Sequence, residues 1–236
     1  MSPHVLHLEA LAFGLLAIVF SLFEACFGLF PSEGPRHLLH RIAAAGWSAL
    51  GHGGLRALLL SVLVLQGGSI RWGRLGVALV VTDFGLYVGH RALHHKWLWR
   101  GHRLHHSIEH LGWLSGFRGS LVHASVHVLV QVGVFALFTL NTGELLFAFV
   151  LAAVLQFWAH ANVGWDLGLL RFVLITPAGH RFHHASEARH WGRNFGEVSM
   201  VWDHLFGTFT DPRVDPRGPV GLGGGQRPEL RDWIGV

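Results

Sequence analysis

The fold class is decided by two stretches that contain no Asp, Glu, Lys or Arg: residues 119–143, GSLVHASVHVLVQVGVFALFTLNTG, and residues 145–165, LLFAFVLAAVLQFWAHANVGW. With a helical rise of about 1.5 Å per residue, each stretch is long enough to cross the ~30 Å hydrocarbon core of a bilayer. We therefore expect two membrane helices in the central part of the chain.

Three further apolar runs precede this pair. They are residues 5–30, interrupted by Glu9 and Glu24, residues 42–70, interrupted by Arg56, and residues 75–90, interrupted by Asp83. The whole chain is 51% hydrophobic and 14% charged, with a mean hydropathy of +0.41. These values exclude an ordinary soluble protein and a disordered one. The sequence predicts an all-α, polytopic membrane bundle with five spans.

The arginines indicate the orientation of this bundle. They gather in residues 91–118 and in the chain after residue 165, and such loops stay on the cytoplasmic side of a membrane. The same two regions contain most of the clustered histidines, so we expect a cytoplasmic, histidine-rich helical cap. Arginine richness favours a bacterial inner membrane. The net charge of +4 comes from arginines that flank apolar runs rather than form a basic stripe, so no nucleic-acid partner is expected.

Composition divides the chain into three parts. Residues 1–74 are N-terminal membrane helices, residues 75–212 contain the histidine clusters, and residues 213–236, rich in Gly, Pro and Arg, are expected to be a loosely ordered tail.

The 20 histidines are the unusual feature of the composition. The pattern H-x-x-H-H, expected less than once by chance at this frequency, occurs as HRLHH at residues 102–106 and as HRFHH at residues 180–184. On a helix, residues three or four positions apart share a face, so two imidazoles can converge on one ion while the adjacent histidine turns toward a second. This spacing indicates a site for two metal ions.

Some of the other histidines are further candidate ligands, and the rest are expected to have structural roles. His90 and His94 are one helical turn apart, and His160 lies near the end of the last predicted span. Imidazole ligands suit Fe, Zn, Cu or Ni, and the zinc-protease motif H-E-x-x-H is absent from the sequence. His123 and His127 are expected to hydrogen-bond a neighbouring helix. Structural or interfacial positions are expected for His4, His7, His37, His40 and His52.

Two polar residues precede the first histidine pair on the same helical face. Asp83 and Tyr87 lie seven and three positions before His90. A carboxylate inside an apolar run is costly unless it has a function, so we expect Asp83 to fix the tautomer of a ligand imidazole.

Over residues 80–212 the chain resembles the membrane-bound fatty acid hydroxylase and sterol desaturase superfamily. The motifs that carry the resemblance are Asp83, Tyr87, His90 and His94; Leu98, Trp99, His102, His105, His106 and Ser107; Gln156, His160 and Asn162; Thr176, Pro177, His180, His183 and His184; and Asn194, Phe195 and Gly196 with Trp202, Asp203, Leu205, Phe206, Gly207 and Thr208. In the segments His106-Ser107-x-Glu109 and Arg118-Gly119-Ser120-Leu121, the chain resembles the alkylglycerol monooxygenase branch of this superfamily.

The resemblance implies a lipid oxygenase with a non-haem di-iron centre that uses O₂ and electrons from a separate donor protein to hydroxylate or desaturate a lipid such as a fatty acyl chain, sterol or ether lipid. The implied metal ligands are His90, His94, His102, His105, His106, His160, His180, His183 and His184. Asp83, Tyr87 and Asn194 are the candidate catalytic residues. Gln156 stands where some relatives have a histidine, and His95 is an alternative to His94 as a ligand.

Two other functions are alternatives to this oxygenase. A membrane transporter for a divalent metal would need ligands spaced through the membrane depth, whereas the clustered histidines map to one side. A bis-imidazole haem protein would need single histidines paired across helices rather than doublets.

Overall fold

A computed structural model describes residues 3–29, 35–61, 67–215, 217–224 and 226–236. The helices are α1 (Pro3–Phe27), α2 (Pro35–Ser61), α3 (Trp72–Leu93), α4 (Trp99–His106), α5 (Leu121–Leu137), α6 (Thr142–His160), α7 (Pro177–His183), α8 (Val201–Leu205) and α9 (Leu230–Ile234). Short 3-10 helices are η1 (Trp113–Phe117), η2 (Gly168–Phe172), η3 (Ala188–His190) and η4 (Pro212–Val214). Apart from two isolated β-bridges, the secondary structure of these residues is helical, which confirms the all-α prediction.

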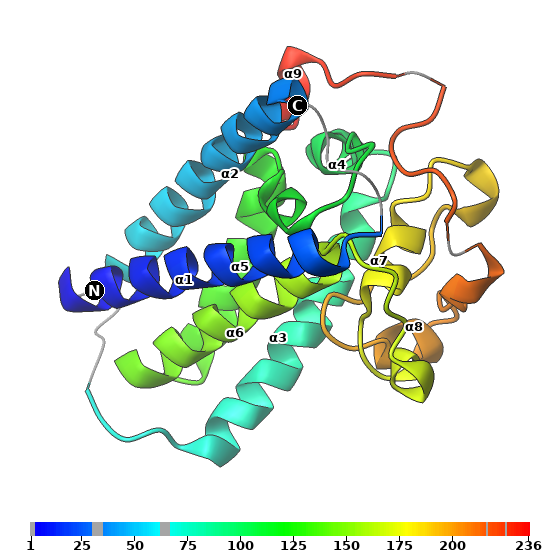
Figure 1. Cartoon of the computed structure of the whole chain (residues 1–236). Helices are drawn as coiled ribbons and strands as arrows, with labels where there is room; N and C mark the ends of the chain where they lie inside the picture. Colours follow the sequence, from blue (N-terminus) through cyan, green and yellow to red (C-terminus); the bar gives the residue numbers. More distant parts are fainter. Residues whose placement is uncertain (1–2, 30–34, 62–66, 216, 225) are drawn as a thin grey trace.

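The five long helices form a bundle (Figure 1). Helix α5 packs against α2 and α3, and α6 packs against α1. The main hydrophobic core lies between these helices where α5 ends and α6 begins. It contains Leu60, Leu75, Ala78, Val128, Val132, Phe135, Leu140, Leu145, Ala148 and Phe149.

A capping box separates the two charge-free stretches. The Asn141 side chain accepts a hydrogen bond from the Glu144 N–H at 3.0 Å, and the Glu144 carboxylate accepts one from the Asn141 N–H at 2.9 Å. Glu144 also accepts hydrogen bonds from the Arg71 N–H and the Arg74 guanidinium, so this turn is attached to the start of α3. Helix α6 consequently begins at Thr142, before the charge that separates the two runs, and ends at His160.

The short helices α4 and α7 lie at the other end of the bundle, where α3 and α6 end and α5 begins. Figure 1 shows α7 and α8 beyond the ends of the long helices. Helix α7 has a clear local start signal: Pro177 occupies the first turn and the Thr176 hydroxyl accepts a hydrogen bond from the Gly179 N–H at 3.0 Å. Helices α4 and α7 carry the two H-x-x-H-H motifs.

Among the described residues, one helix, α6, combines the length and hydropathy needed to cross a membrane. The apolar part of α1 (Leu11–Phe27) and helix α5 are shorter. The structure thus supports one of the five predicted spans directly.

The C-terminal residues pack against the histidine-bearing end. Helix α9 contacts α4 and α5, and the buried Asp232 carboxylate forms an ion pair with Arg103 of α4. The indole N–H of Trp47 in α2 donates to the Trp233 carbonyl at 3.0 Å. The division of the chain at residues 74 and 212 stays a prediction.

Replacing Asp232 by Ala should lower the free energy of unfolding by roughly 1–3 kcal/mol, because the Arg103 guanidinium and the Glu229 N–H lose a buried acceptor. The matched control is Glu187→Gln, which weakens an exposed ion pair with Arg189 and should change stability by less than about 1 kcal/mol. Thermal unfolding of the purified protein checks both variants, and equal melting temperatures would show that α9 does not stabilise α4.

Candidate metal centre

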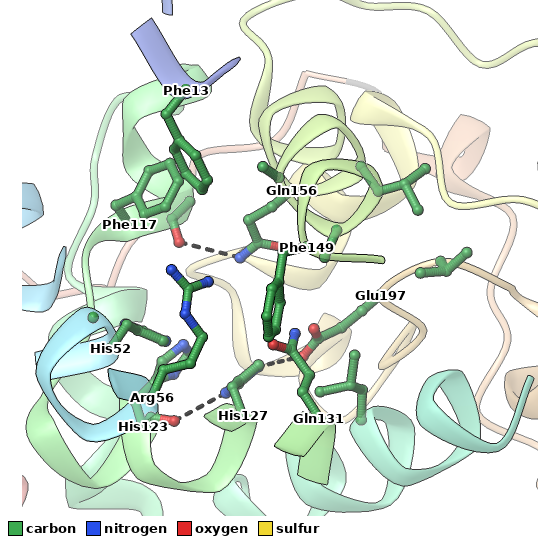
Figure 2. Close-up of a pocket in the computed structure, with 17 residues that line it drawn as sticks. Phe13, His52, Arg56, Phe117, His123, His127, Gln131, Phe149, Gln156 and Glu197 are labelled. Carbon is green, nitrogen blue, oxygen red and sulfur yellow. Dashed lines mark hydrogen bonds and ion pairs between the residues drawn. The ribbon is translucent and has the colours of Figure 1, made fainter. Parts of the chain in front are cut away.

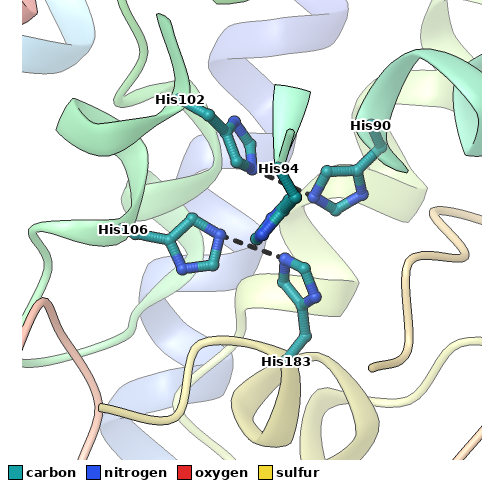
Figure 3. A group of neighbouring side chains, drawn as sticks. All are labelled: His90, His94, His102, His106 and His183. Carbon is teal, nitrogen blue, oxygen red and sulfur yellow. Dashed lines mark hydrogen bonds between the residues drawn. The ribbon is translucent and has the colours of Figure 1, made fainter. Parts of the chain in front are cut away.

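The nine histidines implied as ligands come together in two groups at one end of the bundle. The possible ligand atoms within each group lie within 4.8 Å of one another. The first group, drawn in Figure 3, contains His90, His94, His102, His106 and His183. The second group contains His105, His160, His180 and His184.

Each H-x-x-H-H motif is shared between the two groups. In α4, His102 and His106 face the first group and His105 faces the second. In the second motif, His180 and His184 belong to the second group and His183 belongs to the first. This is the division expected from the spacing, with two imidazoles one turn apart in one group and the adjacent histidine in the other.

Backbone carbonyls fix the orientation of four of these imidazoles. The Nδ1–H groups donate from His90 to Phe195 at 2.8 Å, from His105 to Arg118 at 2.9 Å, from His160 to Gln156 at 3.0 Å and from His183 to Arg193 at 2.8 Å. A carbonyl oxygen can only accept, so the proton of each neutral ring is on Nδ1. The Nε2 atom of each ring therefore keeps a free lone pair.

The Nε2 atoms converge. They lie 3.0 Å apart between His90 and His102, 3.1 Å between His106 and His183, 2.9 Å between His160 and His180, 3.1 Å between His180 and His184, and 3.3 Å between His105 and His160. In His105 and His160 both protons are on Nδ1, so the two facing Nε2 lone pairs repel unless a cation lies near both. Two clusters of neutral nitrogen donors therefore fit two transition-metal ions, with Fe, Zn, Cu and Ni as the candidates by donor type.

Burial keeps these rings in the form that binds metal. It lowers the pKa of His183 to about 4 and, together with neighbouring imidazoles, holds the pKa values of other cluster histidines well below the usual range. These others, in and next to α4 and α7, are His102, His105, His106, His180 and His184. Neutral imidazole is the ligand form, so the site is prepared for metal at neutral pH.

The loop at residues 193–196 orients two histidines of the first group. Its carbonyls at Arg193 and Phe195 accept the Nδ1–H groups of His183 and His90. Asn194 adopts a positive φ of 54°, and its side chain donates to Thr210 O and accepts from Thr210 N. The buried Asp203 carboxylate accepts hydrogen bonds from the backbone N–H groups of Phe195 and of the next residue at 2.8 and 2.7 Å. Asn194 and Asp203 thus anchor the carbonyls that orient His90 and His183.

The other two candidate catalytic residues, Tyr87 and Asp83, form hydrogen bonds with the segment that follows this loop. The Tyr87 hydroxyl hydrogen-bonds the Thr208 hydroxyl at 3.0 Å. The Asp83 carboxylate accepts hydrogen bonds from the Trp202 indole at 2.8 Å and from the Ser199 N–H at 3.4 Å. Asp83 therefore binds the segment that follows the loop, rather than a ligand imidazole as its spacing suggested.

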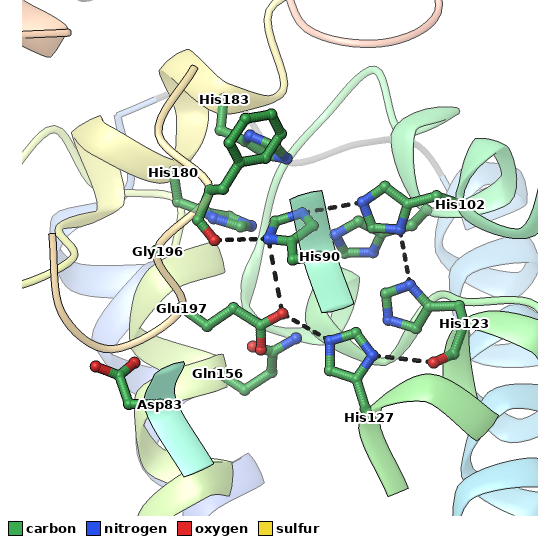
Figure 4. A network of polar contacts seen from close by, with 12 residues as sticks. Asp83, His90, His102, His123, His127, Gln156, His180, His183, Gly196 and Glu197 are labelled. Atoms are coloured by element: carbon green, nitrogen blue, oxygen red, sulfur yellow. Dashed lines mark hydrogen bonds and ion pairs between the residues drawn. The ribbon is translucent and has the colours of Figure 1, made fainter. Parts of the chain in front are cut away.

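A carboxylate that the sequence analysis missed lies next to an imidazole. Glu197 Oε1 is 3.6 Å from His90 Nδ1 and 2.6 Å from His127 Nε2 (Figure 4). His123 Nδ1 lies 2.8 Å from His102 Nδ1, and the His123 and His127 rings stack. The i, i+4 spacing of His123 and His127 was the only signal in the sequence for this contact. It predicted a hydrogen bond to a neighbouring helix but did not identify the partner residue.

The two alternative ligands lie outside the groups. His95 is exposed, whereas His94 belongs to the first group. The Gln156 side chain donates to the Gly116 carbonyl at 3.1 Å, and its backbone carbonyl orients His160.

A cavity of about 370 Å³ adjoins the histidine groups (Figure 2). Phe13, Phe117 and Phe149 supply apolar walls. His123 and Glu197, which contact His102 and His90, form part of its lining. The size and mostly apolar lining are those of a small-molecule site, and the position is next to the first histidine group.

Parts of the chain are similar to known proteins. The fatty acid hydroxylase family model matches residues 75–208. Ornithine lipid hydroxylase OlsE of Rhizobium tropici is 32% identical over 151 residues, which are 63% of this chain and 45% of that protein. Human alkylglycerol monooxygenase is 33% identical over 135 residues, which are 56% of this chain and 29% of that protein. The zebrafish (Danio rerio) enzyme is 32% identical over 142 residues, which are 56% of this chain and 30% of that protein. The chain thus spans less than half the length of these relatives. No solved structure matches it.

The adjacent residues His183 and His184 give a direct test of the two groups. Each Ala substitution removes one imidazole from a different group, so each should reduce bound metal from two ions per chain to about one. Elemental analysis of iron-loaded protein measures this. His110→Ala, at an exposed histidine outside both groups, is the control and should keep both ions. Full metal content in both variants would refute the grouping.

Proposed function

Because the chain belongs to the fatty acid hydroxylase family, we propose that it is a membrane-bound, non-haem di-iron oxygenase that hydroxylates a lipid with O₂ and external electrons. The observation that carries this proposal is the pair of buried histidine groups that share α4 and α7. The similarity to a lipid hydroxylase and to alkylglycerol monooxygenases favours hydroxylation over desaturation.

Two bound irons would supply the activation of O₂ and the oxidation of an unactivated C–H bond. The residues of the chain bind and orient this centre. The nine histidines offer neutral nitrogen ligands, and the loop at residues 193–196 fixes the rings of His90 and His183. We assign Asp83, Tyr87 and Asn194 to positioning of the segments around this loop.

The cavity is the proposed substrate site. Its aromatic walls suit an alkyl chain, and its lining includes Gln156, whose backbone carbonyl accepts the hydrogen bond from His160, as well as His123 and Glu197. A lipid carbon in this cavity lies beside the histidine groups while the surrounding helices exclude water.

We further propose a multi-pass membrane protein with the histidine groups on the cytoplasmic side. Exposed apolar side chains on the outer faces of α1 and α3 support further crossings besides α6. They include Leu11, Leu15, Ile18 and Leu22 of α1, and Val77, Val80 and Val88 of α3. Exposed arginines near the histidine-bearing end, such as Arg189 and Arg193, suit docking of an acidic electron-donor protein. Metal transport is not favoured, because both groups lie at one end of the helices.

Iron-loaded protein in lipid nanodiscs, supplied with a chemical reductant and a lipid extract, should consume O₂ and form a hydroxylated lipid. With ¹⁸O₂, product mass spectrometry should show one labelled oxygen per hydroxyl group. Iron spectra should report two coupled ions. Equal activity of metal-free or zinc-loaded protein would contradict the di-iron proposal.

Cysteines introduced at Ser107 and Ser186 test the orientation. Each serine follows one histidine-bearing helix and is partly exposed, so both positions should react with a membrane-impermeant reagent from the cytoplasmic side. A variant with Cys26 replaced by Ala provides the background, because Cys26 is exposed. Labelling of the two positions from opposite sides would contradict the proposed topology.

A further inference from the structure

The proposed substrate cavity contains a glutamine that the metal centre does not use. Gln131 belongs to α5, is partly buried and lines the cavity. Residues 128–138, VLVQVGVFALF, contain no other polar side chain. Figure 2 shows the Gln131 side chain next to the Phe149 ring. A polar side chain in so apolar a helix is costly and indicates a function when it faces a cavity.

The hydrogen-bonding capacity of Gln131 is unused within the described part of the chain. The second glutamine of the cavity, Gln156, donates to the Gly116 carbonyl at 3.1 Å, and His127 and Glu197 bind each other at 2.6 Å. The Gln131 amide forms no hydrogen bond with the residues that the structure describes. An amide has two N–H donors and an acceptor oxygen, and leaving them without partners among apolar walls is unfavourable. A bound group that both donates and accepts would satisfy them.

The position of Gln131 relates such a group to the metal centre. His123, His127 and Gln131 follow one another at intervals of four residues, so they share one face of α5, and all three line the cavity. Eight residues separate the first from the last, which is about 12 Å along the helix axis. His123 lies 2.8 Å from His102 of the first histidine group. One extended lipid can therefore place a polar group at Gln131 and a carbon atom beside the first group.

We propose that Gln131 binds a hydroxyl group of the lipid substrate and that this contact selects hydroxylated lipids over plain alkyl chains. The inference rests on the proposed function and narrows its substrate class. A hydroxyl is the smallest group that both donates and accepts, so it pairs with the amide oxygen and the amide N–H together. An ether or ester oxygen only accepts. Phe13 and Phe117 then supply the apolar walls for the alkyl chain.

Binding of three uncharged probes to the full-length protein in detergent tests the proposal. The probes are hexadecanol, hexadecyl methyl ether and 1-chlorohexadecane, which share one chain and form two, one and no hydrogen bonds with an amide. Each affinity is compared between wild-type protein and a variant, so partition of the probe into detergent cancels. Binding needs no turnover, and metal content is measured in each sample to show that the histidine groups are intact.

Gln131→Met removes the amide and keeps a side chain of similar length. With about threefold in affinity for each hydrogen bond, this variant should bind hexadecanol about tenfold more weakly and the ether about threefold more weakly. The affinity for 1-chlorohexadecane should stay within about twofold. Gln131→Asn keeps the amide on a shorter side chain and should retain part of the preference for the alcohol. Gln226→Met, at an exposed glutamine outside the cavity, is the control and should behave as wild type.

Three results would overturn the proposal. Equal losses for all three probes would mean that Gln131 only packs against the cavity wall. Equal losses for the alcohol and the ether would mean that the amide donates but does not accept, which excludes a hydroxyl as its specific partner. Unchanged affinity for hexadecanol in Gln131→Met would mean that another side chain binds the hydroxyl group.

Failure of this inference is distinct from failure of the proposed function. If iron-loaded protein hydroxylates a lipid and Gln131→Met changes no binding ratio among the probes, the function stands and the hydroxyl site is wrong. If hexadecanol binding depends on Gln131 but no lipid is oxidised, the hydroxyl site stands and the oxygenase proposal is wrong.

Discussion

The rest of the structure depends on one recurring contact, the hydrogen bond from an imidazole Nδ1–H to a backbone carbonyl. This bond decides which nitrogen of each ring carries the proton, and so leaves the opposite Nε2 lone pair facing the interior. The four carbonyls come from three separate segments, which are the residue after η1, helix α6 and the loop at residues 193–196. The fold must therefore bring distant parts of the chain together before the two histidine groups can form.

Burying so many imidazoles is unfavourable without a bound cation, because unprotonated Nε2 atoms such as those of His105 and His160 face each other at 3.3 Å. The surrounding structure offsets part of this cost. Asp203 holds the N–H groups of residues 195 and 196, and α9 fixes α4 through the ion pair between Asp232 and Arg103. The short helices α4 and α7 would not be stable alone, so their geometry depends on these contacts.

The local patterns of the sequence carried most of the information about the site. The H-x-x-H-H spacing predicted how each motif divides between two groups, because that depends only on helix geometry. The all-helical prediction is confirmed for the described residues, and the family resemblance is confirmed by the match over residues 75–208. The partners of Asp83 and the position of Glu197 could not be predicted, since both depend on contacts more than a hundred positions apart along the chain. Helix α6 begins before Glu144 rather than after it, because the Glu144 side chain takes part in the capping box. A search for charge-free stretches does not detect this role.

The two histidine groups differ in what supports them on the cavity side. In the second group, His105 and His160 are held by backbone carbonyls, which move only with the chain. In the first group, His102 is held by the side chain of His123, which stacks on His127, and His127 binds Glu197 close to His90. This path joins two ligands of one group through side chains that line the cavity. Side chains can rotate when a ligand enters, whereas the carbonyls of a packed helix cannot. The orientation of His102 in the first group therefore depends on side chains that line the cavity.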